Sequence, residues 1–489
     1  MILFLASRPV VPTARRLSSA AFRGAAGPRP GPPPRGTGAG PAAPRRTNDT
    51  DHTDDTDHTD HTDHTDDGAA EAAGGTRPSP RSLLAPYRRL FAVPGAVAFT
   101  LAGLVGRVAG SMLGVGMVLM IATVRDSYAL AGAVSATGLA VTALTGPLLG
   151  RLVDRHGQAR VAVPAVAVYA LGATAMLLCV HYGAPAWALF VCAVGSSGVP
   201  SLGSMTRARW AAVHRDDPAA RHTANSFEQV VDEVCFMAGP ALAMVLCTAV
   251  FPEAGVATAA VLLVVGTLLF AAQRRTEPPP RTRATAVSAP GSGSGGAEGS
   301  LTRSPGLRVV VLTFLATGAV FGSMEVATVA AVESYGHGSA SSAVLALQAA
   351  GSCVAGLVFG ALPVRGSAAT RFLAGVAAMA VAALPLLAAN GLATLTPLLF
   401  VAGMATAPTM ISGMTLVHRL TPPTRLNEGM TTVYTGLLVG ISAGAAAGGW
   451  TVDHLGPDAG YTAPATAAAL ALLAAAGGAG RLRRSLGAG

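Results

Sequence analysis

The chain has 489 residues, of which 51% are hydrophobic and only 12% are charged, and its formal net charge is +9. Because a soluble chain carries about 25% charged residues, this composition excludes an ordinary soluble globular protein and indicates one that lies in lipid. All 34 basic residues are arginine. They flank apolar segments, so we interpret them as membrane topology signals and predict no nucleic-acid partner.

Residues 1–88 are rich in Pro, Gly and Arg, and they contain a repeat of Asp, His and Thr from Thr47 to Gly68. Such a segment cannot bury a core, which predicts a disordered tail. The histidines of the repeat could bind a divalent metal weakly, but an expansion without function is the favoured interpretation. The true start of translation could lie downstream. We predict no metal site, and the five cysteines lack metal-ligand spacing.

Twelve apolar runs of helical length follow the tail, and about 20 residues suffice to cross about 30 Å of lipid. The runs are Pro94–Ala122, Tyr128–Leu149, Val161–His181, Ala186–Thr206, Ser226–Phe251, Gly255–Ala272, Val309–Val332, Ser341–Leu362, Phe372–Asn390, Leu392–Leu416, Met430–Val452 and Tyr461–Gly480. This predicts an all-α membrane protein with six-helix bundles over 89–273 and 308–480. A flexible Pro/Gly/Ser/Arg-rich linker over 274–307 joins them, and a tail covers 481–489.

The arginines between the runs are distributed unevenly. With the start of the first run placed in the cytoplasm, seventeen arginines fall in loops on that side, and only Arg125 falls on the other. The seventeen are Arg151, Arg155, Arg160, Arg207, Arg209, Arg215, Arg221, Arg274, Arg275, Arg281, Arg283, Arg303, Arg308, Arg365, Arg371, Arg419 and Arg425. The positive-inside rule then predicts a multi-pass protein of a bacterial inner (plasma) membrane with both termini in the cytoplasm.

The two predicted bundles repeat short sequences at nearly one offset. The matches are Gly110-Ser111-Met112 with Gly322-Ser323-Met324, Ala133-Val134 with Ala343-Val344, and, in degraded form, Gly150–Arg155 with Gly360–Arg365. Each match alone is weak, but all three fall at the same positions of the predicted helices. Two parallel six-helix repeats are typical of one large class of transporters.

The loop after the second run reads Gly150-Arg-Leu-Val-Asp154-Arg155-His-Gly157-Gln-Ala-Arg160. Glycine permits a tight helix end, and Asp154 can meet a helix N-terminus or an arginine, while the arginines can bridge to the other half. Such a cluster can hold one state of a two-state carrier. The alternative is an ordinary basic loop.

This loop resembles the signature of the major facilitator superfamily, Gly-x-x-x-Asp-Arg/Lys-x-Gly-Arg-Lys/Arg. The match is at Gly150, Asp154, Arg155, Gly157 and Arg160, and the chain departs from the signature at Gln158 and Ala159. In the degraded second copy, Val364 replaces the acidic residue. The resemblance extends from about Leu90 to Gly480 and implies a rocker-switch transporter whose substrate cavity lies between the two halves.

The antiporter branch of this superfamily carries a Gly/Pro motif in its fifth helix, and Gly239-Pro240 resembles part of it. The resemblance implies drug/proton antiport. A Gly-Pro pair in a membrane helix can also be a simple kink.

Charges within the predicted spans are candidates for function, because each costs about 2.5–3.5 kcal/mol at the membrane centre. We predict that Arg107 of the first helix pairs with Asp232 or Glu233 of the fifth at the cavity, the alternative being an ion pair that only fixes packing. Glu228, four residues before Asp232, is predicted to form a structural or gating salt bridge with Arg207 or Arg209.

Glu325 lies toward the outer half of the seventh predicted helix, whose run Val309–Val332 contains no basic residue. A buried carboxylate can take up and release a proton. Glu325 is therefore predicted to be the coupling residue, and the alternative is a water-exposed carboxylate in an outer vestibule.

Two further patterns concern helix packing and helix ends. Gly436, Gly440, Gly444 and Gly448 form a stripe that predicts close packing or sliding between the halves. Asn225 and Asn427 are predicted to cap the fifth and eleventh helices, with Glu428 complementing the helix dipole.

The function predicted from the sequence is secondary active transport of a small molecule, with proton-coupled efflux by a monomer. The alternatives are a non-transporting sensor or scaffold with the same fold and an importer of a polar metabolite. An intramembrane enzyme is disfavoured because clustered catalytic residues are lacking. The sequence contains no GxxxxGK[ST] motif for ATP, and no cofactor is predicted.

Overall fold

The computed structural model describes residues 80–280, 304–363 and 366–487. The predictions for residues 1–79, including the Asp/His/Thr repeat, for most of the linker, and for Val364 and Arg365 lie outside the described residues.

The described elements are helical. A first helix, α1 (Pro80–Leu90), precedes a group made of α2 (Ala96–Arg125), α3 (Tyr128–His156), α4 (Gln158–His181), α5 (Ala186–Gly195), α6 (Leu202–Val213), α7 (Pro218–Ala249) and α8 (Ala254–Ala272), followed by the short 3-10 helix η2 (Arg274–Thr276). The second group comprises α10 (Pro305–Ser334), η4 (Gly338–Ala340), α11 (Ser341–Ala361), α12 (Ala368–Ala383), η5 (Leu384–Ala388), α13 (Leu392–Leu420), η6 (Pro423–Arg425), α14 (Leu426–Leu455), η7 (Pro457–Ala459) and α15 (Thr462–Gly487).

Among the described residues, eleven helices are long and apolar enough to span a membrane. The fourth expected span, Ala186–Thr206, is instead divided into α5 and α6, which are separated by Ser196–Ser201. The two pieces run back along α4: Ala184, just before α5, lies beside the end of α4, where Arg125 donates to the carbonyls of both Cys179 and Ala184. In α6, the Met205 carbonyl accepts from Gln158 at the start of α4. The divided segment therefore makes the fourth crossing.

The ends of the predicted domains need three corrections. Residues 80–88 were expected to belong to the disordered tail, but they form most of α1, and Leu90 at its end is buried. The linker was expected to begin at 274, but Glu277 accepts a hydrogen bond from the Ala159 backbone. The tail over 481–489 was expected to be separate, but α15 continues to Gly487 because Leu482 is buried in the core.

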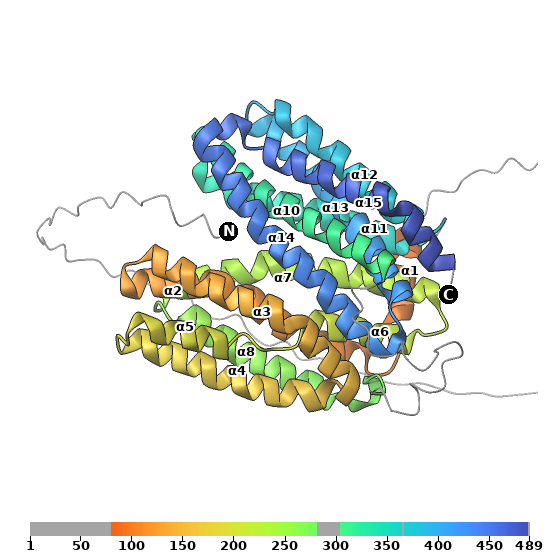
Figure 1. The fold of residues 1–489 in the computed structure, drawn as a ribbon, viewed down its shortest axis with the longest axis horizontal. Coiled ribbons are helices and arrows are strands. Elements are labelled where there is room, and N and C mark those ends of the chain that lie inside the picture. Colours follow the sequence, from red (N-terminus) through yellow and green to blue (C-terminus); the bar gives the residue numbers. More distant parts are fainter. Residues whose placement is uncertain (1–79, 281–303, 364–365, 488–489) are drawn as a thin grey trace, which may run out of the picture. The chain divides into compact units, whose positions relative to one another are not determined.

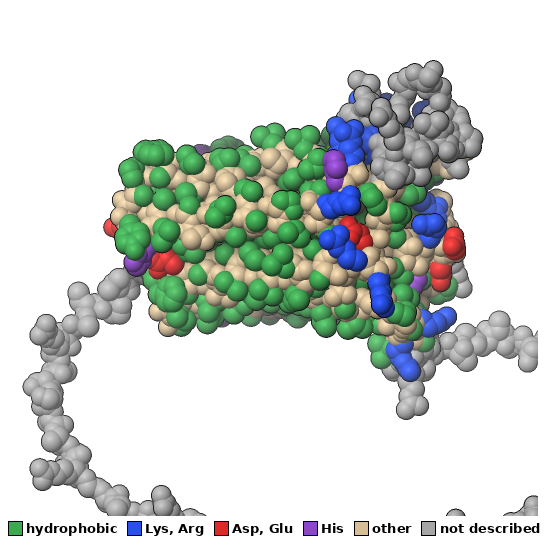
Figure 2. Space-filling view, turned by 90° about the horizontal axis from the view of Figure 1, so that it is seen from below, with side chains coloured by type: hydrophobic (Ala, Val, Ile, Leu, Met, Phe, Trp, Pro, Cys, Tyr) green, Lys and Arg blue, Asp and Glu red, His purple; other side chains and the backbone are tan. Residues whose placement is uncertain are grey.

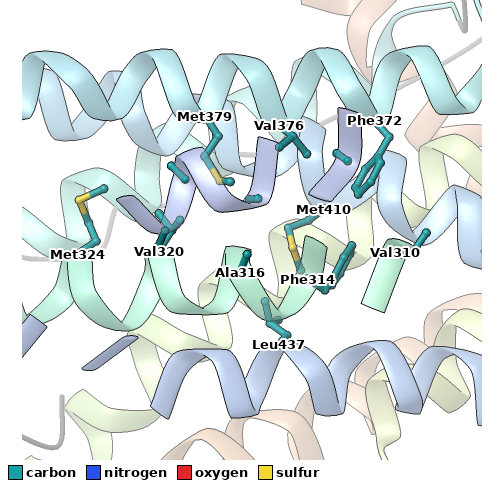
Figure 3. Packing of buried hydrophobic residues seen from close by; sticks show 14 of the residues in the cluster. Val310, Phe314, Ala316, Val320, Met324, Phe372, Val376, Met379, Met410 and Leu437 are labelled. Atoms are coloured by element: carbon teal, nitrogen blue, oxygen red, sulfur yellow. The ribbon is translucent and has the colours of Figure 1, made fainter. Parts of the chain in front are cut away.

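Figure 1 shows α2, α4, α5 and α8 packed in one group and α10, α12, α13 and α15 in the other. In the second group, α10 supplies a row of apolar side chains at helical spacing. Figure 3 shows Phe314 of this row beside Met410 of α13, and the Phe314 ring stacks on that of Phe372 of α12 with the ring centroids 6.4 Å apart. The second half thus builds an apolar core around α10.

Glycines bring α10 and α14 into backbone contact. A Cβ on Gly440 would lie 1.9 Å from the carbonyl oxygen of Leu315, and one on Gly444 would lie 2.1 Å from that of Ala319. From α10, Gly318 and Gly322 approach α14 in the same way. The predicted close packing is present, but the stripe faces a helix of its own half. The expectation of sliding between the halves was wrong, because the neighbour of this stripe is α10 and not the first bundle.

The surface matches a protein immersed in lipid. Figure 2 shows hydrophobic side chains over most of one face, whereas arginines gather toward one end. Many large apolar side chains, such as Leu144, Leu171 and Leu473, are exposed along the spans, as expected for a surface that faces lipid. We refer to the end formed by the last turn of α3 and the first turn of α14 as the arginine-rich end.

The glycine contact gives a prediction for stability. Substituting Gly440→Ala forces α10 and α14 apart, and overpacking of this kind costs about 1–3 kcal/mol. We expect the purified protein to melt at a lower temperature than the wild type. The matched control is Gly110→Ala, whose Cβ would have no atom within 4 Å, and its melting temperature should be unchanged or slightly higher. Equal melting of both variants would contradict the packing argument.

Candidate functional site

One contact between the two halves at the arginine-rich end is centred on a carboxylate. Asp154, in the last turn of α3, accepts hydrogen bonds from the backbone N–H of Asn427 at 3.1 Å, from the Asn427 side chain at 2.8 Å and from the backbone N–H of Glu428 at 2.9 Å. The first N–H groups of any helix have no partner within the helix. Here a side chain of the first half supplies the acceptors for α14 of the second half.

An ion-pair network surrounds this contact. Glu428 accepts from Arg151 of α3 and from Arg425, each with a closest distance of 2.8 Å. Gly150 is essential for the approach, because a Cβ there would lie 2.8 Å from the Asn427 carbonyl oxygen. We call the contact formed by Gly150, Arg151, Asp154, Asn427 and Glu428 the interhalf cap.

The structure corrects the predicted capping asparagines. Asn427 lies inside the first turn of α14 and donates to Asp154. Glu428 lies in the first turn of α14, where an acidic residue complements the helix dipole as expected, and it is also held by two arginines. Asn225 lies within α7, because that helix begins two turns earlier, where Asp217 accepts from the N–H groups of Ala219 and Ala220. Proline at position 218 starts the helix there, since its fixed φ suits a first helical position.

The remaining signature residues lie beside the cap. Gly157 has φ 94°, in the region that favours glycine, and separates α3 from α4. Gly157 lies next to Glu277, whose carboxylate accepts a hydrogen bond from the Ala159 N–H at 3.0 Å. This hydrogen bond fixes the start of α4. Arg155 and Arg160 are exposed, and neither forms an ion pair with a described residue. Arg151, in contrast, bridges the halves.

A second polar cluster lies inside the bundle and consists of alternating charges. Arg107 of α2 donates to Glu228 and Asp232 of α7, and its side chain is 7% exposed. Arg207 of α6 donates to the other oxygen of Asp232 at 2.6 Å. Two cations and two anions thus compensate each other, which a buried charge requires.

Two aromatic residues complete this buried charge cluster. Trp210 Nε1 donates to Glu228 Oε1 at 2.8 Å. Tyr434 of α14 donates its hydroxyl to Asp232 at 3.0 Å, and its ring lies 5.5 Å from the Arg207 guanidinium. Tyr434 thereby links the second half to the charges of the first. We call Arg107, Arg207, Glu228, Asp232 and these two aromatics the charge cluster.

The structure pairs Arg107 with Asp232, one of its two predicted partners. Glu233, the other predicted partner, does not bind Arg107. Glu233 lies about 100° around α7 from Asp232 and points to α11, where it accepts from Ser352 at 2.8 Å and from Gln229 at 3.1 Å. The predicted partners of Glu228 were wrong: it binds Arg107 and Trp210.

Arg207 and Arg209 face different sides of α6 because two residues turn a helix by about 200°. Arg209 therefore points away from α7. It donates to Gln158 at 2.8 Å and to the Gln273 and Phe270 carbonyls, and its guanidinium stacks over the Phe270 ring at 3.8 Å. Its role is to hold α4, α6 and α8 together.

Glu325 is half-buried on α10. The expected run contained no basic residue, but α10 begins at Pro305 and includes Arg308 near its opposite end.

Gly239 of α7 packs against α2. A Cβ on Gly239 would lie 2.6 Å from that of Ser111 and 3.0 Å from the Val108 carbonyl oxygen. α7 stays helical across Pro240, so the Gly-Pro pair lets α2 and α7 approach one turn from Arg107.

The sequence interpretation missed Tyr434, Trp210 and Ser352 as partners. Tyr434 could have been found from the sequence, because it is a polar aromatic residue seven positions after Asn427 and therefore on the same face of the helix. No sequence signal indicated that Ser352 lies opposite Glu233, because serine is common in the apolar runs.

Comparisons with known proteins agree with this architecture. The family description Major Facilitator Superfamily matches residues 99–396, and no curated protein matches the sequence. The human organic anion transporter MFSD10 is 15% identical with a TM-score of 0.60, covering 80% of this chain and 99% of its own. A bacterial homologue of the iron transporter ferroportin in an outward-facing state is 14% identical with a TM-score of 0.62, over 80% and 99% of the two chains.

The fucose:proton symporter FucP of E. coli is 14% identical with a TM-score of 0.58, covering 78% of this chain and 98% of that one. At such identities these structures establish a common fold, whereas the family match covers more than half of the chain. This multi-pass membrane protein, a secondary transporter and not an enzyme, belongs to the major facilitator superfamily.

Proposed function

We propose that this protein is a monomeric, proton-coupled secondary transporter that exports a small molecule from a bacterial cell by alternating access. The observation that carries the proposal is the interhalf cap, in which Asp154 of one half accepts hydrogen bonds from the first turn of a helix in the other half. In the proposed orientation, the arginine-rich end and both termini lie in the cytoplasm, consistent with the arginine distribution. The described state is then closed toward the cytoplasm.

The interhalf cap is suited to a reversible gate. Its bonds are hydrogen bonds and ion pairs, and each contributes about 0.5–1.5 kcal/mol, or more where a charge takes part. They can break together when the halves rotate, because none of them belongs to the core of either half. The free N–H groups of α14 would then be solvated by water at the opened end.

Proton coupling is supported by Glu233. This carboxylate lies outside the Arg pairs, and its acceptor bond from Ser352 crosses between the halves. A protonated carboxyl is a weaker acceptor than a carboxylate, so proton uptake would loosen the contact of α7 with α11. Glu325, the coupling residue expected from the sequence, is the second candidate for this role.

Export is supported by Gly239-Pro240, which lies at the contact between α2 and α7 beside the charge cluster. A second candidate is proton-coupled import of a polar metabolite, and the two buried arginines near the fourth crossing favour it. The relatives with similar folds include both an organic anion transporter and a proton symporter by description. Transport in vesicles of defined orientation would separate the two directions.

Removing the Asp154 carboxylate should open the arginine-rich end. The change Asp154→Ala deletes three hydrogen bonds to α14. Their loss destabilises the closed state by at least about 1.4 kcal/mol, which raises the population of the open state about tenfold. The measurement is the rate of thiol labelling of Thr431→Cys, a position 7% exposed at the closed contact, in a protein without its five native cysteines. We expect labelling to accelerate by about tenfold.

The matched control for this experiment is Arg155→Ala, which removes a neighbouring exposed charge of the same motif. Its labelling rate should stay near that of the parent protein. Acceleration by Arg155→Ala alone, or unchanged labelling in Asp154→Ala, would reject the interhalf cap as the gate.

The proton-carrying role gives a pH-dependent prediction. Because protonation weakens the bond between Glu233 and Ser352, labelling at Thr431→Cys should accelerate as the pH falls from about 8 to about 5. Glu233→Gln mimics the protonated acid and should label rapidly at every pH. Rates are normalised to Asp216→Cys, an exposed position at the same end, to remove the titration of the thiol itself.

Glu325→Gln serves as the comparison. If this variant keeps the pH response while Glu233→Gln loses it, Glu233 carries the proton. The reverse result would assign the role to Glu325, and a full response in both variants would exclude both carboxylates.

A further inference from the structure

Two of the five cysteines lie side by side in the first half. The Sγ atoms of Cys179, near the end of α4, and Cys192, in α5, are 3.9 Å apart. The other three cysteines lie on α7 and α11 and are Cys235, Cys247 and Cys353. The fold therefore brings together two thiols that are thirteen positions apart in the chain.

The thiol pair lies at the end of the bundle opposite to the arginine-rich end. α4 begins at Gln158, beside the interhalf cap, and ends at His181, two residues after Cys179. Its 24 residues are about 36 Å long at about 1.5 Å per residue, which exceeds the about 30 Å of hydrocarbon in a bilayer. The last turn, with Cys179, therefore reaches the membrane surface. In the proposed orientation this is the outer surface, where disulfides form and persist.

The backbones that carry the two thiols are held in place by packing. Arg125, the last residue of α2, donates to the carbonyl oxygens of Cys179 at 2.8 Å and of Ala184 at 2.6 Å, which fixes the turn between α4 and α5. At the far end of α5, a Cβ on Gly172 would lie 2.7 Å from the carbonyl carbon of Gly195. α4 and α5 are thus in close contact along the whole of α5.

The two thiols differ in exposure. Cys192 is buried and belongs to an apolar cluster, whereas Cys179 is half-buried at the edge of the same cluster. A disulfide needs the sulfur atoms about 2.05 Å apart, and each sulfur moves by rotation about the single bond that joins its Cβ to the backbone. The more exposed Cys179 can be reached first by a reagent from outside.

The short helix α5 has a need that a covalent link would meet. α5 has 10 residues, whereas a helix of about 20 residues is required to cross the membrane. The chain that follows, Ser196–Ser201, is not helical. Helices shorter than about 12–15 residues are marginal by themselves, so α5 depends on its attachment to α4.

We propose that Cys179 and Cys192 form a disulfide on the outer side of the membrane and that this bond anchors α5 to α4. The inference rests on the orientation given with the proposed function. It does not depend on the substrate, on proton coupling or on the direction of transport.

The bond forms by two exchanges with a disulfide donor, which is a protein or a small molecule of the oxidising compartment. The Cys179 thiolate attacks one donor sulfur, and the first donor thiolate leaves. The Cys192 thiolate then attacks Cys179 Sγ in the mixed disulfide, and the second donor thiolate leaves. Each cysteine sulfur loses one electron and the donor gains two. The two thiol protons pass through water to the released donor thiolates.

The test counts free thiols in the full-length protein. Cells that express it are quenched with acid, and the denatured protein is alkylated with N-ethylmaleimide and weighed by mass spectrometry. We expect three of the five cysteines to be alkylated, and all five after prior reduction with dithiothreitol. Peptide mapping should link Cys179 to Cys192. Five alkylated cysteines without reduction, or a link between other cysteines, would overturn the proposal.

Matched variants test the anchoring role. The wild type and Cys353→Ser, which changes a half-buried cysteine of α11, should melt several degrees higher in oxidised than in reduced glutathione, because the bond restricts the unfolded chain. Cys192→Ser should melt at the same temperature in both. If Cys192→Ser does not fold, Cys179→Ala replaces it. A gain in the variant that lacks the pair, or no gain in the wild type, would refute the anchoring of α5.

A final experiment separates the pairing from the orientation. Purified wild-type protein, first reduced, is exposed to oxidised glutathione, and its thiols are counted again. A pair that is reduced in cells but links in the purified protein would reject the proposed orientation, and with it the native disulfide. A pair that stays reduced in both cases would reject the pairing alone, because the gating experiments at Thr431→Cys do not depend on it.

Discussion

The start of α14 depends on a residue that belongs to the other half of the molecule. Every helix begins with N–H groups that need acceptors, and for α14 the carboxylate of Asp154 provides them. The same constraint explains Gly150, because any side chain there would block the approach. A helix end that is complete only when the halves touch makes the contact specific, and in the proposed gate the same bonds would break when the halves part.

The charge cluster extends this coupling into the membrane interior. A buried ion pair seldom adds stability over apolar packing, but removing one partner leaves a costly isolated charge. Arg107, Arg207, Glu228 and Asp232 therefore have to remain together, and they hold α2, α6 and α7 in a fixed relation. Because Tyr434 of α14 donates to Asp232, a rotation of the second half changes the surroundings of these charges directly.

Helical rotation explains which sequence predictions about the site succeeded. Glu228 and Asp232 are four residues apart, so their common face could be read from the sequence, and both bind Arg107. Glu233 is one residue further and faces α11 instead. Likewise, Arg207 and Arg209 were treated as interchangeable partners, although two residues place them on nearly opposite faces of α6. The sequence did not reveal this, since Arg207 and Arg209 were expected in the loop after a span that ended at Thr206, whereas both lie in α6.

The residues alone were enough to predict a helical membrane protein with two similar halves, because lipid demands long apolar helices and leaves the polar loops outside. The sequence also identified Gly150 and Asp154 as a special pair, since their spacing resembles a family signature. The three-dimensional contacts were needed to show that α14 receives the Asp154 cap, that the glycine stripe of α14 faces α10, and that the fourth crossing is interrupted beside two arginines. These contacts join residues far apart in the chain, and the importance of a small residue such as Gly440 becomes clear only from the atoms that surround it.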